Sequence, residues 1–171
     1  MDAALKAKFA KIKLLATDFD GVMTDGFLYV DENGKESVRC SRKDGLGIEL
    51  LKKNGLMVGV LSKEKNFVVA ARCQKLNIPV WQGIESGEGK LEILRRIVAE
   101  NNLSQSEVAY IGDDINDLLC LKYAGLALTV ADGHPLVKAS ANYVSKANGG
   151  QHAVREIAEM ILMAKDAKLD V

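Results

Sequence analysis

Short, uninterrupted apolar runs alternate with amphipathic segments along nearly the whole chain. A continuous apolar run bounded by polar residues is typical of a strand buried on both faces, and apolar residues at helical spacing indicate a helix buried on one face. Strands separated by helices in this way form a parallel sheet that is covered on both sides. The pattern therefore predicts an α/β fold, and it places any ligand beyond the carboxyl ends of the strands.

The expected elements follow one another without a repeat, a low-complexity tract or a Pro/Gly linker. Strands are expected at residues 13–17, 56–61, 78–81, 108–111, 126–130 and 142–144. Helices are expected at residues 46–53, 66–76, 91–101, 118–123, 135–139 and 153–164. Two β-rich runs on either side of Asn33-Gly34, at residues 27–30 and 35–40, indicate a hairpin.

The composition is that of one soluble globular domain spanning residues 1–171, with 48% hydrophobic residues. There are 23 basic and 23 acidic side chains, so the net charge is zero, and a nucleic-acid partner, which needs a basic face, is not expected. The longest run without a charged residue, 123–131, is far shorter than the ~20 residues of a membrane span. We expect no secretory signal, and the odd number of cysteines (Cys40, Cys73 and Cys120) predicts reduced thiols in a cytoplasmic protein.

Two acidic residues, Asp18 and Asp20, directly follow the first expected strand. They are two positions apart on a chain that leaves a strand, so both carboxylates can point to one spot beyond the sheet edge. One can attack a phosphorus atom while the other protonates the leaving oxygen and later activates water. Attack on an anionic phosphoryl group requires charge cancellation, which predicts a nearby Mg²⁺ and a cationic side chain. Taken alone, the pair is also compatible with a helix cap and a turn.

Three further elements fall at the ends of later strands. Ser62 offers a hydroxyl and a backbone N–H to a phosphate, and Lys90, at the entrance to a helix, can contact both a phosphate and a nucleophile. The acidic residues of segment 112–117 repel one another unless a hard cation binds them. Ser62 alone is compatible with a turn and Lys90 alone with a solvated lysine, but their order along the chain favours a phosphoryl-transfer site.

This ordered set resembles the haloacid dehalogenase superfamily of phosphotransferases over essentially the whole chain. The resemblance implies a Rossmann-like, three-layer, doubly wound parallel sheet. It also implies that Asp18 is the nucleophile that forms an aspartyl-phosphate and that Asp20 is the general acid and base. By the same resemblance, Ser62 and Lys90 bind the phosphate, and Lys90 also takes part in catalysis. Asp113 would bind Mg²⁺ together with the Asp18 carboxylate and the Asp20 carbonyl. Asp114 and Asp117 would support this metal site.

The spacing of the motifs leaves no room for a cap domain. The segment from Asp20 to Ser62 holds only the hairpin, one helix and one strand, and the segment from Ser62 to Lys90 holds one helix and one short strand. A small substrate still needs a site with little water. We therefore expect neighbouring subunits to cover the site, with the hairpin at residues 27–39 packed against a neighbour in a homotetramer.

Within the superfamily, the chain is most similar to the capless 3-deoxy-D-manno-octulosonate 8-phosphate phosphatases. The similarity rests on segments 25–26, 42–48, 110–114, 130–135, 148–150 and 153–156. It implies a homotetrameric, Mg²⁺-dependent enzyme of lipopolysaccharide biosynthesis that releases the free sugar acid and phosphate. It also implies a tail after Met163 that reaches a neighbour's site, and substrate contacts from Thr24, Asp25, Gly26, Lys43, Asp44, Glu64 and Lys65.

Two departures from this family leave alternatives open. The usual Thr-Gly-Arg is Ser62-Lys63-Glu64 here, and the usual Gly-Gly-Arg-Gly is residues 149–152, Gly-Gly-Gln-His. Glu64 with Lys65 resembles phosphatases that act on the 9-phosphate of a nine-carbon ulosonate, 2-keto-3-deoxynononate or N-acetylneuraminate. The same triplet resembles the C-terminal domain of CMP-sialic acid synthetases, so a non-catalytic oligomerisation domain is the alternative from another class. A phosphatase acting on proteins is compatible with the missing cap, but no docking surface is evident.

Overall fold

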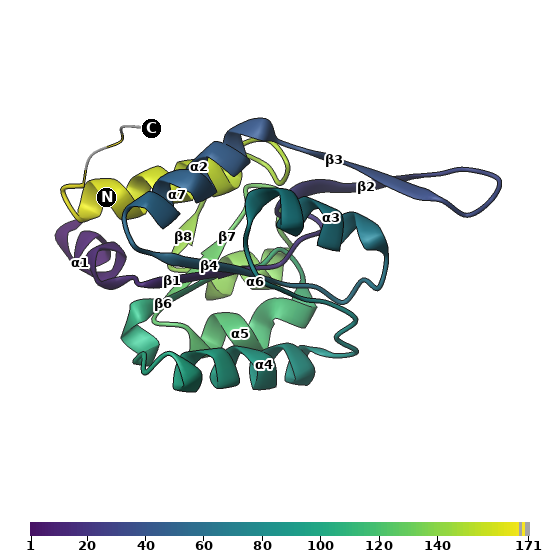
Figure 1. Ribbon diagram of the computed structural model, residues 1–171. Helices are drawn as coiled ribbons and strands as arrows, with labels where there is room; N and C mark the ends of the chain where they lie inside the picture. The colour runs from purple at the N-terminus through teal and green to yellow at the C-terminus, as the bar shows by residue number, and fades with distance from the viewer. Residues whose placement is uncertain (168, 170–171) are drawn as a thin grey trace.

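The computed structural model describes residues 1–167 and 169, which form one α/β unit around a parallel sheet (Figure 1). The strands are β1 (Leu14–Thr17), β2 (Thr24–Val30), β3 (Glu36–Cys40), β4 (Met57–Leu61), β5 (Val80–Trp81), β6 (Val108–Ile111), β7 (Leu126–Thr129) and β8 (Tyr143–Val144). The helices are α1 (Ala3–Lys11), α2 (Arg42–Lys53), α3 (Phe67–Leu76), α4 (Gly87–Glu100), α5 (Leu118–Tyr123), α6 (Pro135–Ser140) and α7 (Ala153–Ala164), with 3₁₀ turns η1 (Gln105–Glu107) and η2 (Ile115–Asp117).

The main sheet has six strands in the order β5-β4-β1-β6-β7-β8, and every neighbouring pair in it is parallel. The first strand of the chain, β1, lies in the middle, where it pairs with β4 and β6 and is buried at all four positions. A central position suits a strand made only of apolar residues and threonine, because both of its faces are covered. The carboxyl ends of β1, β4 and β6 therefore meet at one edge of the sheet.

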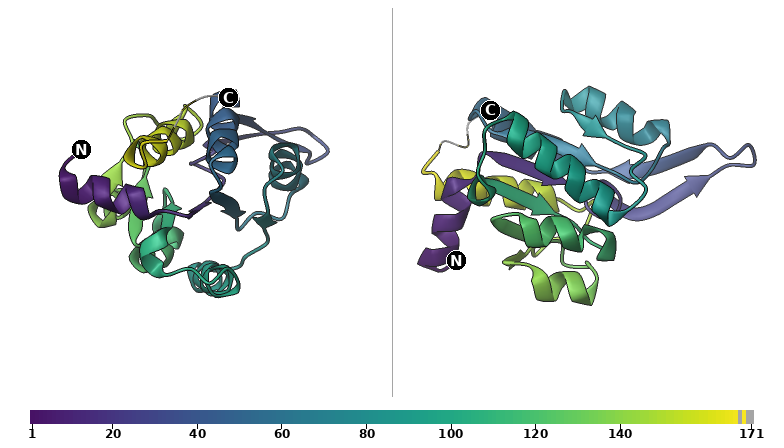
Figure 2. Two further views of the ribbon diagram at one scale, coloured as in Figure 1. Left: turned by 60° about the vertical axis from the view of Figure 1, so that its left-hand side comes forward. Right: turned by 90° about the horizontal axis from the view of Figure 1, so that it is seen from below.

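Helices cover both faces of this sheet. One apolar cluster contains residues of α1, α2, α3 and α7, and the other contains residues of α4, α5 and α6. In Figure 1, α2, α3 and α7 lie above the sheet and α4 and α5 lie below it, and the further views in Figure 2 show the same layers. The α/β fold with three layers and without a cap domain, predicted from the sequence, is thus confirmed.

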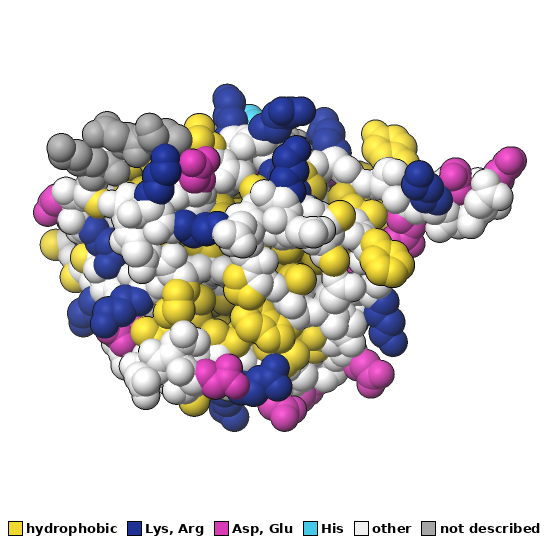
Figure 3. Space-filling model, viewed as in Figure 1, with side chains coloured by type: hydrophobic (Ala, Val, Ile, Leu, Met, Phe, Trp, Pro, Cys, Tyr) yellow, Lys and Arg dark blue, Asp and Glu magenta, His cyan; other side chains and the backbone are white. Residues whose placement is uncertain are grey.

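The hairpin of β2 and β3 stands apart from the layered body and projects beyond it (Figures 1 and 3). Its strands are antiparallel, with a register shift between Thr24 and Leu28 that follows the positive φ of Gly26. It begins three residues earlier than expected, at Thr24. Four consecutive apolar side chains along β2 are exposed by half or more: Phe27 (75%), Leu28 (51%), Tyr29 (72%) and Val30 (58%).

Two helices begin a turn earlier than expected, which changes the position of several candidate site residues. Helix α2 begins at Arg42, because Ser41 Oγ accepts from the N–H groups of Lys43 and Asp44. Helix α4 begins at Gly87, so Lys90 lies inside the helix and not before it. A Cβ at Gly87 would come within 2.8 Å of the Asn116 carbonyl oxygen, so this glycine permits close packing.

The cysteines and the helix lengths agree with the expectations from composition. Cys40, Cys73 and Cys120 are free thiols, and Cys73 and Cys120 are buried. Among residues 1–167 and 169, no helix combines the length and the apolar character that crossing a membrane requires.

Candidate active site

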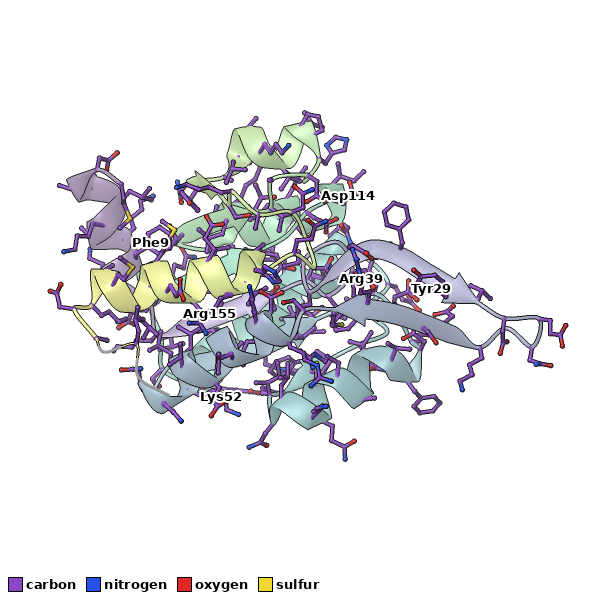
Figure 4. The ribbon with its side chains drawn as sticks, turned by 90° about the horizontal axis from the view of Figure 1, so that it is seen from above. Phe9, Tyr29, Arg39, Lys52, Asp114 and Arg155 are labelled. Carbon is purple, nitrogen blue, oxygen red and sulfur yellow. The ribbon has the colours of Figure 1, made fainter. Side chains whose placement is uncertain are left out.

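Three strand ends converge on one cavity at the carboxyl edge of the sheet. Asp18 follows β1, Ser62 follows β4, and the segment from Gly112 to Asp114 follows β6. The cavity measures about 470 Å³. Its lining residues are Asp18, Asp20, Gly21, Gly26, Ser62, Lys63, Glu64, Asp113, Asp114, Ile115 and Asn116. In Figure 4, Asp114 lies at the same end of the body as the root of the hairpin, which carries Arg39 and Tyr29.

A buried chain of charges begins at Asp18. Its Oδ1 accepts from the Phe19 N–H at 2.7 Å, and its Oδ2 lies 2.7 Å from the Nζ of Lys90. The same Nζ lies 2.8 Å from Asp117 Oδ1. Lys90 and Asp117 are inaccessible to solvent and Asp18 is 6% exposed. Lys90 therefore lies behind Asp18 and holds it in one orientation, whereas the other face of Asp18 lines the cavity.

Asp117 is held by four donors of the chain itself. Besides Lys90, the Tyr110 hydroxyl donates to Oδ1 at 2.7 Å, and the N–H groups of Asp113 (3.1 Å) and Asp114 (3.5 Å) donate to Oδ2. Gly112 permits this packing, because a Cβ there would overlap the Asp117 side chain. Asp117 thus fixes the loop that carries Asp113, and both of its oxygens are engaged within the protein.

The electrostatics of this group depend on burial and on repulsion between its acids. Burial alone would lower the pKa of Lys90, but the charges of Asp18 and Asp117 outweigh it and raise the pKa, so the ammonium stays protonated. Burial, and then the charge of Asp117, raises the pKa of Asp18, against the opposing effect of Lys90. Burial, and then the charges of Asp117 and Asp114, raises the pKa of Asp113 to about 7. The site therefore has more negative charge than its one buried lysine balances.

The acidic side chains are close enough to share one cation. Asp18, Asp113 and Asp117 each offer a carboxylate oxygen, and these atoms lie within 4.8 Å of one another. Gly21, with φ +76°, brings the Asp18–Asp20 loop against this group, and a Cβ there would overlap the Asp113 carboxylate. Oxygen ligands of this kind suit a hard divalent cation. Each Asp117 oxygen already accepts from two donors, whereas each Asp18 oxygen accepts from one. Asp18 and Asp113 also line the cavity, so they are the side chains of this group that can bind an ion.

Asp20 lines the same cavity as Asp18 and is less buried. Thr24 Oγ1 approaches its Oδ1 at 3.5 Å and accepts from the N–H groups of Gly21 (3.2 Å) and Gly26 (3.1 Å), so Thr24 ties the loop together. Burial, and then the charge of Glu64, raises the pKa of Asp20. A carboxyl group with a raised pKa retains its proton closer to neutral pH, as a general acid requires.

Comparisons with known proteins agree with this geometry. Residues 61–157 match the family described as haloacid dehalogenase-like hydrolase. The chain is 35% identical over 171 residues to the 3-deoxy-D-manno-octulosonate 8-phosphate phosphatase of Escherichia coli K12, covering 99% of this chain and 89% of that protein. The chain belongs to the haloacid dehalogenase-like hydrolases.

Solved structures of two phosphatases extend the match to three dimensions. The 3-deoxy-D-manno-octulosonate 8-phosphate phosphatase of Yersinia pestis superposes with a TM-score of 0.93 at 35% identity, covering 97% of this chain and 89% of that one. The enzyme of the same name from Moraxella catarrhalis, solved with magnesium, phosphate and 3-deoxy-D-manno-octulosonate (KDO), gives 0.92 at 32% identity, covering 97% and 94%. The predicted family and the assignment as a phosphoric monoester hydrolase are confirmed, and they oppose the non-catalytic alternative.

The structure brings seven of the fourteen predicted site residues of this hydrolase to the cavity, and it changes the role that Ser62 can have. Its backbone N–H donates to the Trp81 carbonyl at 2.8 Å, so the expected N–H contact with a phosphate is wrong. Its hydroxyl oxygen accepts from the Glu64 N–H at 3.1 Å, which leaves the hydroxyl hydrogen to be donated. Lys90 reaches Asp18 as expected, but it does not line the cavity.

Several expected substrate contacts lie elsewhere in the described chain. Asp44 is buried, with Oδ1 accepting from the Arg155 N–H at 2.8 Å, so it holds α7 against α2. Asp25 pairs with Arg39 at 2.7 Å, and Thr24 is buried in the loop. Lys43 lines a different cavity of about 600 Å³, and Lys65 lines a third one beside α3. Part of the expected tail after Met163 lies outside the described residues.

Four lining residues were not predicted: Gly21, Lys63, Ile115 and Asn116. Lys63 was visible in the sequence only as part of a departure from the family pattern. Ile115 and Asn116 follow Asp114 in the short turn η2, which Asp114 and Asp117 cap, so both residues lie beside the acids. These residues line the cavity without belonging to the pattern of acids and phosphate-binding side chains from which the site was predicted.

Proposed function

We propose that the protein is a Mg²⁺-dependent phosphatase of a 3-deoxy-ulosonic acid phosphate, with 3-deoxy-D-manno-octulosonate 8-phosphate as its substrate. The observation that carries the proposal is the Asp18 carboxylate, which Lys90 holds at 2.7 Å while its other face lines the cavity with Asp20 and Asp113. The eight-carbon substrate follows from the names of the relatives. The product would enter lipopolysaccharide synthesis in the cytoplasm.

The residues present fit a magnesium ion. The side chains of Asp18 and Asp113 would hold it with the backbone carbonyl of Asp20, and the raised pKa values of both side chains are what uncompensated acids show before a cation binds. When bound, Mg²⁺ cancels charge between the carboxylates and the incoming phosphoryl group. Asp114 and Asp117 support the site through the loop that they hold.

In the first step, an oxygen of the Asp18 carboxylate attacks the substrate phosphorus. The bond from phosphorus to the sugar oxygen breaks, and Asp20 donates its proton to that oxygen, so the free sugar acid leaves. Lys90 keeps Asp18 oriented and compensates its charge. The hydroxyl of Ser62 would donate to a phosphoryl oxygen, and the buried charge of Lys90 would attract the phosphate.

In the second step, the Asp20 carboxylate removes a proton from a water molecule, and the water oxygen attacks the phosphorus of the aspartyl-phosphate. The bond between phosphorus and Asp18 breaks, which releases inorganic phosphate and restores the Asp18 carboxylate. Asp20 thus ends protonated, ready for the next cycle. The raised pKa of Asp20 suits both parts of this exchange.

A nine-carbon ulosonate phosphate is the second candidate substrate, because of one observation. Glu64 lines the cavity, and its charge contributes to the raised pKa of Asp20. The eight-carbon family has a cation at this position, so the end of the substrate that reaches Glu64 meets the opposite charge here. A hydroxyl-rich chain would be accepted there more readily than an anionic group.

The protein is proposed to act as a homotetramer in which the hairpin packs on a neighbouring subunit. The support is the row of exposed apolar side chains on β2, Phe27 to Val30, on an element that projects from the body (Figure 3). Patches of this kind mark contact surfaces. A neighbour seated there would stand at the end of the body that carries the Asp18 cavity.

Phosphate release with Mg²⁺ from a panel of sugar phosphates tests the catalytic proposal. The wild type should hydrolyse an ulosonate phosphate, and Asp18→Asn should lose activity by about 10³-fold or more while remaining folded. With p-nitrophenyl phosphate, whose leaving group needs no proton, Asp20→Asn slows mainly the second step, so intact mass spectrometry after mixing should show one added phosphoryl group. Equal, negligible release from wild type and Asp18→Asn would contradict the proposal.

The choice between substrates rests on kcat/KM for the eight-carbon and nine-carbon ulosonate phosphates, measured on wild type and Glu64→Arg. The substitution should move the ratio toward the eight-carbon substrate by about tenfold, since one charge contact contributes roughly 1.5 kcal/mol. Lys63→Arg, a change at a neighbouring lining residue that keeps its charge, is the matched control. An unchanged ratio in Glu64→Arg would remove the reason to consider the longer substrate.

A further inference from the structure

Asp18, Lys90 and Asp117 form a buried chain of charges, called the charge chain below. One buried tyrosine donates to this chain without lining the cavity. Tyr110 lies on β6, is inaccessible to solvent and donates its hydroxyl to Asp117 Oδ1 at 2.7 Å. Lys90 donates to the same oxygen at 2.8 Å. Tyr110 is not among the described residues that line the Asp18 cavity, so it cannot act on a substrate directly.

We propose that Tyr110 is a positioning residue of this hydrolase: by sharing Asp117 Oδ1 with Lys90, its hydroxyl holds the Lys90 ammonium on Asp18. The inference rests on the proposed role of Asp18 as nucleophile. It assigns a function to a core side chain whose apolar neighbours would otherwise suit a phenylalanine.

The physical reason is competition for one carboxylate oxygen. Lys90 lies between two buried carboxylates at nearly equal distances, 2.7 Å from Asp18 and 2.8 Å from Asp117. A second donor on Asp117 Oδ1 satisfies part of its charge, so Asp117 draws the ammonium less strongly. Without the hydroxyl, the buried oxygen loses a partner, and Lys90 is its only remaining side-chain donor among those described. The ammonium then moves toward Asp117 and away from Asp18.

The hydroxyl is suited to be a permanent donor. Burial, and then the charges of Asp117 and Asp18, raises the pKa of Tyr110 well above its usual value, so the proton stays on the phenol oxygen at every pH at which the enzyme would work. A serine or a water molecule at this place would be free to rotate, whereas the tyrosine ring is fixed by the surrounding core.

The chain contains a matched control. Tyr143 on β8 donates its hydroxyl to Glu156 Oε1 at 2.6 Å, and Glu156 also accepts from the N–H groups of Lys146 and Ala147. Asp117 likewise accepts from one tyrosine and two backbone N–H groups, but it also holds Lys90. Removing the hydroxyl of Tyr143 therefore reproduces the loss of a tyrosine–carboxylate bond without touching the charge chain.

The test compares Tyr110→Phe and Tyr143→Phe in steady-state kinetics on p-nitrophenyl phosphate and on the ulosonate phosphates, at saturating Mg²⁺. Tyr110→Phe should lower kcat by about tenfold, the effect of one hydrogen bond to a charged group, and should change KM by less than about twofold. Tyr143→Phe should leave both constants unchanged. In a Lys90→Met background, Tyr110→Phe should have no further effect on kcat, because the group through which it acts is gone.

Wild-type kcat in Tyr110→Phe, or an undiminished tenfold loss in the Lys90→Met background, would overturn the inference. A crystal structure of Tyr110→Phe gives a readout that needs no substrate: Lys90 Nζ should lie beyond about 3.5 Å from Asp18 Oδ2, and an unmoved ammonium would overturn it as well. Failure of the proposed substrate is distinguishable, because the wild type would then hydrolyse p-nitrophenyl phosphate but no ulosonate phosphate.

Discussion

The Asp18 cavity and the hairpin both depart from the usual pattern of apolar side chains inside and charged side chains outside. The cavity has buried charges, and the hairpin has exposed apolar side chains. At the cavity, the charges of Lys90 and Asp117 are fully buried, and the chain itself supplies their partners. On the hairpin, Phe27 and Tyr29 are about three-quarters exposed. Buried charge is costly unless it is paired, and exposed apolar surface indicates a missing partner. The buried charges thus have their partners within one subunit, whereas the hairpin presents apolar side chains that no described part of the chain covers.

The charge chain would be disrupted most strongly by Lys90→Met. The substitution leaves Asp18 and Asp117 buried without their cation, and breaking a buried pair in this way costs about 3–5 kcal/mol in the free energy of unfolding. Urea unfolding at neutral pH measures the loss. Lys53→Met is the control: Lys53 pairs with Glu49 on the exposed face of α2, and its loss should cost about 0.5 kcal/mol or less. Equal costs for the two variants would mean that burial does not distinguish these pairs.

The next largest effect is expected in the free energy of unfolding of the protein as pH and Mg²⁺ concentration change. Asp113 has a pKa of about 7 in the folded protein against about 4 unfolded, so between these values the folded state retains a proton that the unfolded state has lost. The free energy of unfolding of the metal-free protein should therefore fall as pH rises from 4 through 7. The raised pKa values of Asp18 and Asp20 act in the same direction.

Mg²⁺ should reverse this loss at pH 7 and above, since it replaces the protons. At a concentration of one hundred times the dissociation constant, the stabilisation would be about 2.7 kcal/mol, which a thermal-shift series over pH measures. Asp113→Asn should remove most of the Mg²⁺ effect. A metal-free protein whose stability rises steadily from pH 4 to 7 would contradict the burial of uncompensated acids.

Substitutions on the hairpin should change the oligomeric state and leave the stability of the subunit nearly unchanged. The double variant Phe27→Ser/Tyr29→Ser removes exposed apolar surface, so the subunit itself should lose less than about 0.5 kcal/mol in stability, whereas the proposed tetramer should dissociate. Sedimentation velocity gives the oligomeric state. Phe67→Ser is the matched control, since Phe67 is an 87% exposed aromatic residue at the start of α3, off the hairpin. A double variant that stays a tetramer would show that the hairpin does not mediate assembly.

The smallest effect is expected for an ion pair between the two strands of the hairpin, at the end near the cavity. Arg39 of β3 pairs with Asp25 at 2.7 Å, but the arginine side chain is 63% exposed. Arg39→Ala should therefore lower the free energy of unfolding by about 0.5 kcal/mol, with the effect shrinking at high salt. A cost as large as that of Lys90→Met would mean that the pair couples the hairpin to the catalytic loop.

Local sequence patterns were sufficient for the elements and for the order of the acids. Residues 13–17 and 108–111 are short apolar runs that are strands, and Asp18 and Asp113 follow them as predicted. Helix starts were harder to predict, because the cap of α2 is Ser41, which precedes two basic residues and not an apolar one. The family resemblance placed Asp44 near the sugar, but the structure buries it, with Oδ1 accepting from the Arg155 N–H.

By itself, then, the sequence determined the alternation of strands and helices, the family, and which carboxylates share one edge of the sheet, since all of these depend on spacing along the chain. Only the tertiary structure decided that Asp117 is held by Lys90 and Tyr110, that Ser62 uses its N–H within the sheet, and that Lys43 faces another cavity. These facts depend on which donors reach a given oxygen. Residues far apart in sequence compete for such an oxygen, and no local pattern records the outcome.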